Sequence, residues 1–258
     1  MSSVLFVSHG APTFALEPGK LGPQLSALGK RLPRPQAVLV ISPHWLAPQV
    51  RVNHAQKPGT IHDFGGFARE LYSLQYPAVG HPALAERTLE ILAQAGWSGV
   101  ADEQRGLDHG AWVPLRYLYP KADVPVFQLA MPYQLDTVSA YALGQALAPL
   151  QQEGVLIIGS GGLTHNLYEF NGMAREDAPY VKEFARWVAD TVTRQDHASL
   201  TNIMALAPHA QRAHPSLDHL LPLLIAAGAA GTQAKVTVLE GGITYGMLSM
   251  DSYLFTTA

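Results

Sequence analysis

The sequence predicts an α/β fold: a single three-layer domain in which a mostly parallel central sheet is flanked by helices. Unbroken, β-branched apolar runs recur along the chain, and such runs are typical of strands covered on both faces. Segments with helical periodicity alternate with them, which indicates right-handed βαβ units. No composition shift, repeat or low-complexity linker divides the 258 residues, so we expect one domain over residues 1–258.

The expected strands are the apolar runs themselves. In chain order they are Val4–Val7, Ala37–Ile41, Val124–Ala130, Val155–Ile158 and Val236–Leu239. The segments between them carry the helical pattern. They are Leu21–Arg31, Pro82–Ala95, Thr137–Leu150, Ala178–Thr193 and Leu217–Ala227. Residues 49–66 are rich in turn formers and predict a long loop or a small hairpin, a kind of segment that is often functional.

Composition excludes several classes of function. Apolar residues make up 48% of the chain and charged residues 14%, and the net charge of −3 comes without runs of like charge. We therefore expect a compact globular protein that binds no nucleic acid. Cysteine is absent, so disulfides, thiolate nucleophiles and cysteine-ligated metals are excluded. The longest apolar stretch, residues 220–227, is too short to span a bilayer, and with no signal-peptide pattern we expect a cytoplasmic protein without a membrane partner.

Three of the eleven histidines follow predicted strands. His9 comes after the first strand, His44 after the second and His165 after the run that ends at Ile158. The carboxyl ends of parallel strands meet at one rim of a sheet, so these imidazoles should converge there. Convergent imidazoles repel one another when protonated and leave buried nitrogens unpaired when neutral. A divalent cation removes both costs, and the sequence therefore predicts a metal site at this rim.

The segment 209–219 supplies three further histidines, at intervals of five residues. That spacing cannot place them on one helical face. His219 is the best candidate, because Pro215 can start a helix that puts His219 on its apolar side. His209 and His214 are expected to be ordinary surface residues.

Two other patterns allow more than one interpretation. Asp108 and His109 stand next to each other between glycines and before a helix, which can place His109 over a pocket, although such neighbours also arise by chance. The loop Gly159-Ser160-Gly161-Gly162 could cradle a phosphate or let the backbone turn tightly toward a metal site. Nucleotide-binding glycine motifs, a serine-hydrolase elbow and H-E-x-x-H are absent from the sequence.

Six motifs stand in a fixed order between residue 4 and about residue 250. They are Ser8-His9-Gly10-Ala11-Pro12, Ser42-Pro43-His44-Trp45, Ile61-His62-Asp63-Phe64-Gly65-Gly66, Leu107-Asp108-His109-Gly110-Ala111-Trp112, Thr164-His165-Asn166-Leu167 and Asp218-His219-Leu220-Leu221-Pro222-Leu223. Together they resemble the class III (LigB-type) extradiol ring-cleavage dioxygenases, and within them the DOPA 4,5-dioxygenase subgroup.

The resemblance implies a mononuclear non-haem Fe(II) site that opens a catechol ring beside its hydroxyl pair, with a small aromatic diol and O2 as reactants. It implies His9, His44 and His219 as metal ligands. His165 takes the place of the active-site base, and in metal-substituted members this residue can come close enough to be a fourth ligand. His109 resembles the second-sphere histidine that faces substrate and dioxygen.

One difference from the family pattern leaves the identity of the metal undecided. The wider class uses two histidines and one carboxylate, whereas the matched third position here is His219; Glu240 keeps a carboxylate alternative. A neutral third ligand leaves more positive charge on the metal and makes Zn(II) a plausible occupant. Two other functions are compatible with these residues, a zinc-dependent hydrolase and a non-enzymatic binding protein on the same scaffold. Trp45 and Phe64-Gly65-Gly66 could form the wall of an aromatic slot or serve as plain packing. The oligomeric state is left open.

Overall fold

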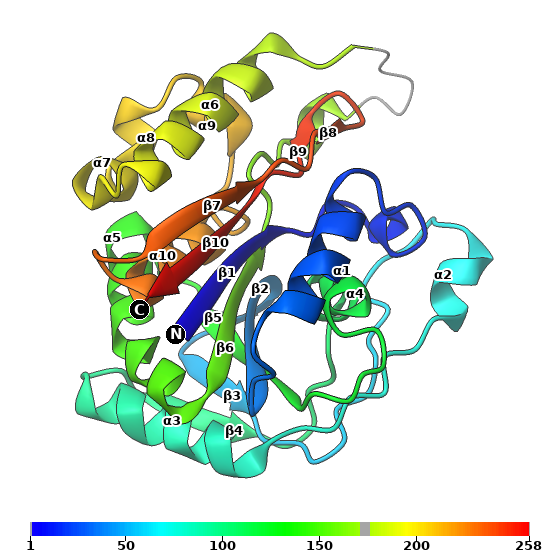
Figure 1. Ribbon diagram of the computed structural model, residues 1–258, viewed down its shortest axis with the longest axis vertical. Coiled ribbons are helices and arrows are strands. Elements are labelled where there is room, and N and C mark those ends of the chain that lie inside the picture. Colours follow the sequence, from blue (N-terminus) through cyan, green and yellow to red (C-terminus); the bar gives the residue numbers. More distant parts are fainter. Residues whose placement is uncertain (1, 171–175, 258) are drawn as a thin grey trace.

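The computed structural model describes residues 2–170 and 176–257 (Figure 1). Four parallel strands form the centre of the sheet: β5 (Val126–Pro132), β2 (Ala37–Ala47), β6 (Val155–Gly161) and β1 (Ser2–Ser8). Beyond β5 lie β3 (Val50–Asn53) and β4 (Gly99–Asp102), and beyond β1 lie β10 (Ser252–Thr257) and β7 (Lys235–Leu239). The order β4-β3-β5-β2-β6-β1-β10-β7 confirms the predicted mostly parallel sheet.

Helices cover both faces of this sheet, as predicted. Side chains of β1 alternate, so that Val4 and Phe6 belong to one apolar core and Leu5 and Val7 to the other. The first core is closed by α3 (Pro82–Gln94), α5 (Thr137–Leu147), α6 (Pro179–Thr193) and α10 (Leu221–Ala230). The second core is closed by α1 (Leu21–Arg31) and α4 (His109–Leu118) (Figure 1).

Shorter elements connect these layers. They are the 3-10 helices η1 (Pro12–Ala15), η2 (Ala148–Glu153) and η3 (Leu167–Glu169), the helices α2 (Arg69–Ser73), α7 (His197–Thr201), α8 (Ile203–Leu206) and α9 (Ala210–Ala213), and the small hairpin of β8 (Ile243–Thr244) and β9 (Leu248–Ser249). Most of the described helices, long and short, start where a proline or a capping side chain serves the first turn. Asp136, for example, forms a capping box with Ser139 at the start of α5.

Several boundaries differ from prediction. The sheet is mixed toward its edges: β3 pairs antiparallel with β5 and β10 antiparallel with β1 and β7, whereas β4 pairs parallel with β3. The short strands β3, β4 and β10 were not predicted. The last long helix begins at Leu221 rather than Leu217, with Pro222 in its first turn. Among the described residues, no helix is both long and apolar enough to cross a membrane. The cytoplasmic location stays a prediction.

The carboxyl ends of β1, β2 and β6 meet at one rim of the sheet. The register of β2 against β5 shifts between Ile41 and Leu46, so the strand bulges where His44 lies. His9 follows β1 directly, and its N–H donates to the carbonyl of Gly161 at the end of β6, at 2.9 Å. The backbone thus fixes His9 and His44 on adjacent parts of one rim.

Candidate metal centre

Three imidazoles converge at this rim, on the elements that the sequence indicated. The Nε2 atoms of His9 and His44 lie 3.1 Å apart. One ring nitrogen from each of His9, His44 and His219 lies within 4.8 Å of the others. His9 is 1% exposed, so its ring lies in the protein interior and is shielded from bulk water.

His219 reaches the site from the turn before α10, not from the helix that we predicted from Pro215. The N–H of Gly162 donates to the carbonyl of His219 at 2.9 Å. A Cβ atom at Gly161 would lie 2.3 Å from that carbonyl oxygen, so only glycine lets the two segments approach this closely. Of the two interpretations of the glycine-rich loop, the structure supports close backbone approach.

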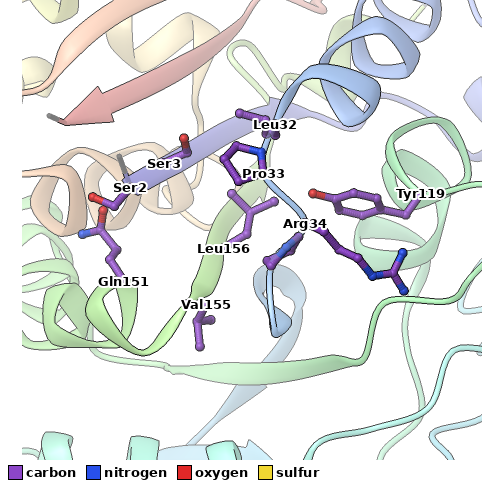
Figure 2. A pocket seen from close by; sticks show the side chains of 11 residues that line it. Ser2, Ser3, Leu32, Pro33, Arg34, Tyr119, Gln151, Val155 and Leu156 are labelled. Atoms are coloured by element: carbon purple, nitrogen blue, oxygen red, sulfur yellow. The ribbon is translucent and has the colours of Figure 1, made fainter.

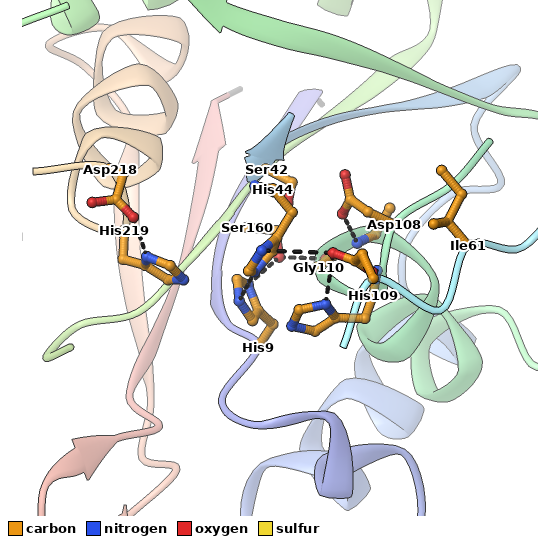
Figure 3. Close-up of polar contacts among 12 residues, drawn as sticks. His9, Ser42, His44, Ile61, Asp108, His109, Gly110, Ser160, Asp218 and His219 are labelled. Carbon is orange, nitrogen blue, oxygen red and sulfur yellow. Dashed lines mark hydrogen bonds and ion pairs between the residues drawn. The ribbon is translucent and has the colours of Figure 1, made fainter. Parts of the chain in front are cut away.

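Hydrogen bonds fix the orientation of His9 and His219 (Figure 3). Ser160 Oγ donates to the carbonyl of Gly110, so it must accept from Nδ1–H of His9, at 3.0 Å. Asp218 Oδ2 accepts a hydrogen bond from Nδ1–H of His219 at 2.6 Å. In both rings Nδ1 therefore carries the hydrogen, and the Nε2 lone pair is free for a metal.

Asp63 holds two further histidines at once. Its carboxylate accepts from the backbone N–H of His109 at 2.9 Å and from Nδ1–H of His109 at 3.0 Å, and it lies 3.6 Å from Nδ1 of His44. The neighbouring carboxylate, Asp108, instead caps α4 by accepting from the N–H of Ala111. The carboxylate partner of His109 is thus not its sequence neighbour, and sequence reasoning missed the roles of both Asp63 and Ser160.

His165 lies beside these rings. Its imidazole stacks on that of His219, with ring centroids 3.5 Å apart and planes 5° from parallel. Its backbone N–H donates to the carbonyl of Ala213 at 2.9 Å. In the described part of the chain, the close group of nitrogens contains His9, His44 and His219 but not His165.

The prediction that His214 is a surface residue is wrong. Its side chain is buried, and its Nε2–H donates to the carbonyl of Leu163 at 2.9 Å, two residues before His165. Nδ1 of His214 is buried without a partner among the described residues. His214 therefore braces the loop that carries His165. His209, as predicted, is at the surface, where its Nε2 lies 2.9 Å from Glu183.

Burial and mutual repulsion keep His9, His44 and His219 neutral. Burial lowers the pKa of His9 most, and the neighbouring histidines lower it further. For the same reasons the pKa of His44 falls to about 4 and that of His219 to about 3. Burial alone would raise the pKa of Asp63, but the hydrogen bonds and charge of His109 outweigh it and lower that pKa to about 2. At neutral pH these three imidazoles are thus neutral, the form that binds metal, and they lie beside an ionised carboxylate.

The histidines lie at a cavity of about 420 Å³ whose other walls are largely apolar, including Phe64, Phe67, Leu167 and Phe170. Phe64 and Gly65 line this cavity as the sequence suggested. Trp45 does not: it packs against Ala47 and Ala130, with the Arg105 guanidinium 5.4 Å from its ring. A flat aromatic molecule fits between such walls.

Other hollows lack this chemistry. A cavity of about 100 Å³ lies where β1 and β6 begin, at the opposite end of the strands (Figure 2). Arg34, which lines this cavity, is paired with Asp123 at 2.9 Å. Glu240, the carboxylate alternative, is exposed at the end of β7 and lines another cavity. Neither place brings a carboxylate to the histidines.

The donor set fits a mononuclear divalent metal. Nitrogen ligands about 2.1 Å from one ion lie about 3–4 Å from each other, as His9 and His44 do. A second group, His44, Asp63 and His109, also has atoms within 4.8 Å of one another. The oxygens of Asp63 already accept hydrogens from His109, so this second group is a hydrogen-bond network and not a ligand set.

Comparison with known proteins gives consistent matches. A family model for the catalytic LigB subunit of aromatic ring-opening dioxygenase matches residues 7–256. The chain is 40% identical to 4,5-DOPA dioxygenase extradiol of Beta vulgaris, covering 100% of the chain and 97% of that relative. It is 36% identical to the protein of that name from Escherichia coli K12, covering 95% and 92%. A crystal structure of an uncharacterized E. coli K12 protein superposes with a TM-score of 0.82 at 29% identity, covering 99% of this chain and 100% of that one.

Proposed function

The chain belongs to the LigB family of aromatic ring-opening dioxygenases, whose reactants are an aromatic substrate and O2, and from this premise we propose a specific reaction. The protein opens the ring of a substituted, DOPA-like catechol beside its hydroxyl pair, at one Fe(II) ion held by His9, His44 and His219. The observation that carries the proposal is the convergence of these three imidazoles at the cavity, with Nδ1 of His9 and His219 already occupied.

When bound, Fe(II) supplies an electron-transfer centre at which catechol and O2 can be brought together. Three histidines gathered at the wall of the cavity leave its open side for the reactants. Because all three ligands are neutral, the centre keeps the full charge of the metal, and this charge favours binding of an anionic catecholate. Asp63 and Asp218 orient their histidines from outside the ligand set.

We propose His165 as the base that takes a proton from a catechol hydroxyl. Burial lowers the pKa of His165, opposed in part by the charge of Asp218, so the ring is neutral and able to accept a proton at pH 7. Its ring lines the cavity and stacks on the proposed ligand His219. A proton acceptor is thus next to the place where the hydroxyl pair would lie.

We propose His109 as the donor toward the negative charge that develops on dioxygen. Its Nδ1–H is committed to Asp63, so Nε2 donates only when the ring carries its second proton. The Asp63 carboxylate supplies the negative charge that balances such a ring. His109 lines the same cavity as His165. The centroid of its ring is 5.3 Å from that of His9, so it is close to the reacting groups.

We also propose that residues 1–258 act as one catalytic domain. The first strand, β1, pairs with the last strand, β10, so the first and last segments of the described chain belong to one sheet, and this supports the proposal.

Anaerobic reconstitution tests the reaction. Samples loaded with Fe(II), loaded with Zn(II) or left without metal would receive a panel of catechols including L-DOPA, followed by air. We expect equimolar oxygen uptake and a yellow ring-opened product with Fe(II) alone. The matched control is His209→Ala, which removes a surface histidine far from the cluster and should keep full activity.

Two outcomes would favour the alternatives. Ester hydrolysis by the Zn(II) sample without oxygen uptake by the Fe(II) sample would indicate a zinc hydrolase. Binding of catechol without turnover in any sample would indicate a binding protein. Either outcome contradicts the proposed reaction.

A further inference from the structure

Among the described residues, the cavity that contains the histidines offers no carboxylate, lysine or arginine to a substituent on the catechol. Apart from histidines and Tyr245, the described residues that line it are apolar or glycine. A carboxylate or ammonium group buried against Phe64, Phe67 or Leu248 would lose its hydration without compensation. Among the described residues, the carboxylate or ammonium partners of a charged substituent lie beyond these walls.

A second cavity, here called the side cavity, adjoins the first. Its volume is about 210 Å³, and Ala11 and Tyr245 line both cavities. The Tyr245 hydroxyl and Thr13 Oγ1 are hydrogen-bonded at 2.7 Å along this border. Tyr245 has φ of 52°, in the left-handed region that residues with a Cβ rarely adopt. The β8–β9 hairpin thus holds the tyrosine at the border at a conformational cost.

The side cavity contains one anion and one cation, Glu17 and Lys20, three residues apart. Neither forms an ion pair with another residue in the part of the chain that the structure describes. Lys20 also borders the cavity of Asp251, but that carboxylate already accepts the N–H of Gly241 at 2.8 Å. Two opposite charges thus remain available beside the active-site cavity.

The position of Lys20 is unfavourable for the helix that follows. Lys20 is the N-cap of α1, where its side chain provides no capping hydrogen bond. The helix dipole disfavours a positive charge there, and the first turn contains no acidic residue to offset it. A residue that lowers helix stability while facing a cavity is better explained by binding than by folding.

We propose that the side cavity receives the ring substituent of the catechol, with Lys20 pairing with a carboxylate and Glu17 with an ammonium group. This proposal rests on the proposed function and deepens it: Glu17 and Lys20 are specificity-determining residues for catechols with a zwitterionic side chain. The apolar lining from Phe14 and Met250 would contact the carbon chain between ring and charges.

Four catechols separate the two charges. L-DOPA carries both, 3-(3,4-dihydroxyphenyl)propionate only the carboxylate, dopamine only the ammonium, and 4-methylcatechol neither. Dissociation constants would be measured by calorimetry under argon on the metal-loaded protein, so that binding is read without turnover. The variants are Lys20→Met and Glu17→Gln, with Lys30→Met, at the exposed far end of α1, as the matched control.

We expect Lys20→Met to weaken binding of L-DOPA and the propionate about fivefold, and Glu17→Gln to weaken binding of L-DOPA and dopamine about fivefold, because Glu17 and Lys20 are both exposed and exposed ion pairs are weak. Binding of 4-methylcatechol should change in neither variant, and Lys30→Met should change nothing. Equal affinity of the unaltered protein for L-DOPA and 4-methylcatechol would overturn the proposal, as would equal losses for all four compounds. Oxygen uptake with 4-methylcatechol reports separately on the proposed function, because that compound needs neither charge.

Discussion

Replacing Asp63 by asparagine removes the charge that serves both His44 and His109 while keeping the shape of the side chain. The pKa of Asp63 is lowered from 3.8 to about 2, which corresponds to at most about 2.5 kcal/mol at 1.36 kcal/mol per unit. The side chain is 18% exposed, and solvent screening reduces this to about 1–2 kcal/mol. The folded-state pKa is depressed, so this stability is present above about pH 4 and disappears as the pH falls through 2.

The effect on turnover should exceed the effect on stability. Asparagine keeps one acceptor oxygen where the carboxylate uses two, so either Nδ1–H or the backbone N–H of His109 would lose its acceptor, and the ring would lose its balancing charge. We expect kcat to fall by a factor of about 10–100, the usual loss when a partner behind a metal-site histidine is removed. Oxygen uptake gives kcat, and urea denaturation at pH 7 gives the free energy of unfolding.

The matched control is Asp123→Asn, which breaks the exposed ion pair with Arg34 at the other end of the strands. It should leave kcat unchanged. If Asp63→Asn kept kcat within a factor of about two, the orienting role of Asp63 would be refuted.

Three further predictions concern the ligands, the backbone and pH. His165→Ala should retain metal and lose turnover, whereas His9→Ala and His44→Ala should lose metal by elemental analysis; metal loss in His165→Ala would make His165 a ligand. Gly161→Ala should lower the free energy of unfolding by about 1–3 kcal/mol and weaken metal binding, because the new Cβ would lie 2.3 Å from the carbonyl oxygen of His219. Gly59→Ala is the control: a Cβ there has no neighbouring atom within 4 Å, so neither quantity should change. The free energy of unfolding of the metal-free protein, measured in urea, should fall as the pH drops from 6.5 to about 4. Burial lowers the pKa of His44 and His214 to about 4, so in this range the unfolded chain binds protons that the folded chain does not. A free energy of unfolding that stays constant over this pH range would contradict the prediction.

The sequence was sufficient to place His9, His44 and His165 at one rim. That inference needs only strand positions and the parallel arrangement, and the structure has both. It was not sufficient for the edges of the sheet. The strands β3 and β4 are four residues each, too short to give a distinct pattern. We expected a long loop or a small hairpin around β3 and no element at β4.

Contacts between segments that are distant in the chain could not be predicted from the sequence. Asp63 and His109 are 46 residues apart and Ser160 and His9 are 151 apart, and no spacing in the sequence indicates that they meet. Asp108, beside His109, was the obvious partner and proved to be a helix cap. His214 was misjudged because helical spacing says nothing about a residue in the irregular segment between α9 and α10.

Labelled dioxygen tests the central claim most directly. The Fe(II)-loaded protein would turn over 4-methylcatechol under ¹⁸O₂, and the rapidly trapped product would be analysed by mass spectrometry. Ring opening beside the hydroxyl pair predicts that both labelled oxygen atoms enter the product, one in the new carboxylate and one in the new aldehyde. Consumption of catechol with no label in the product would contradict dioxygenase chemistry at this site.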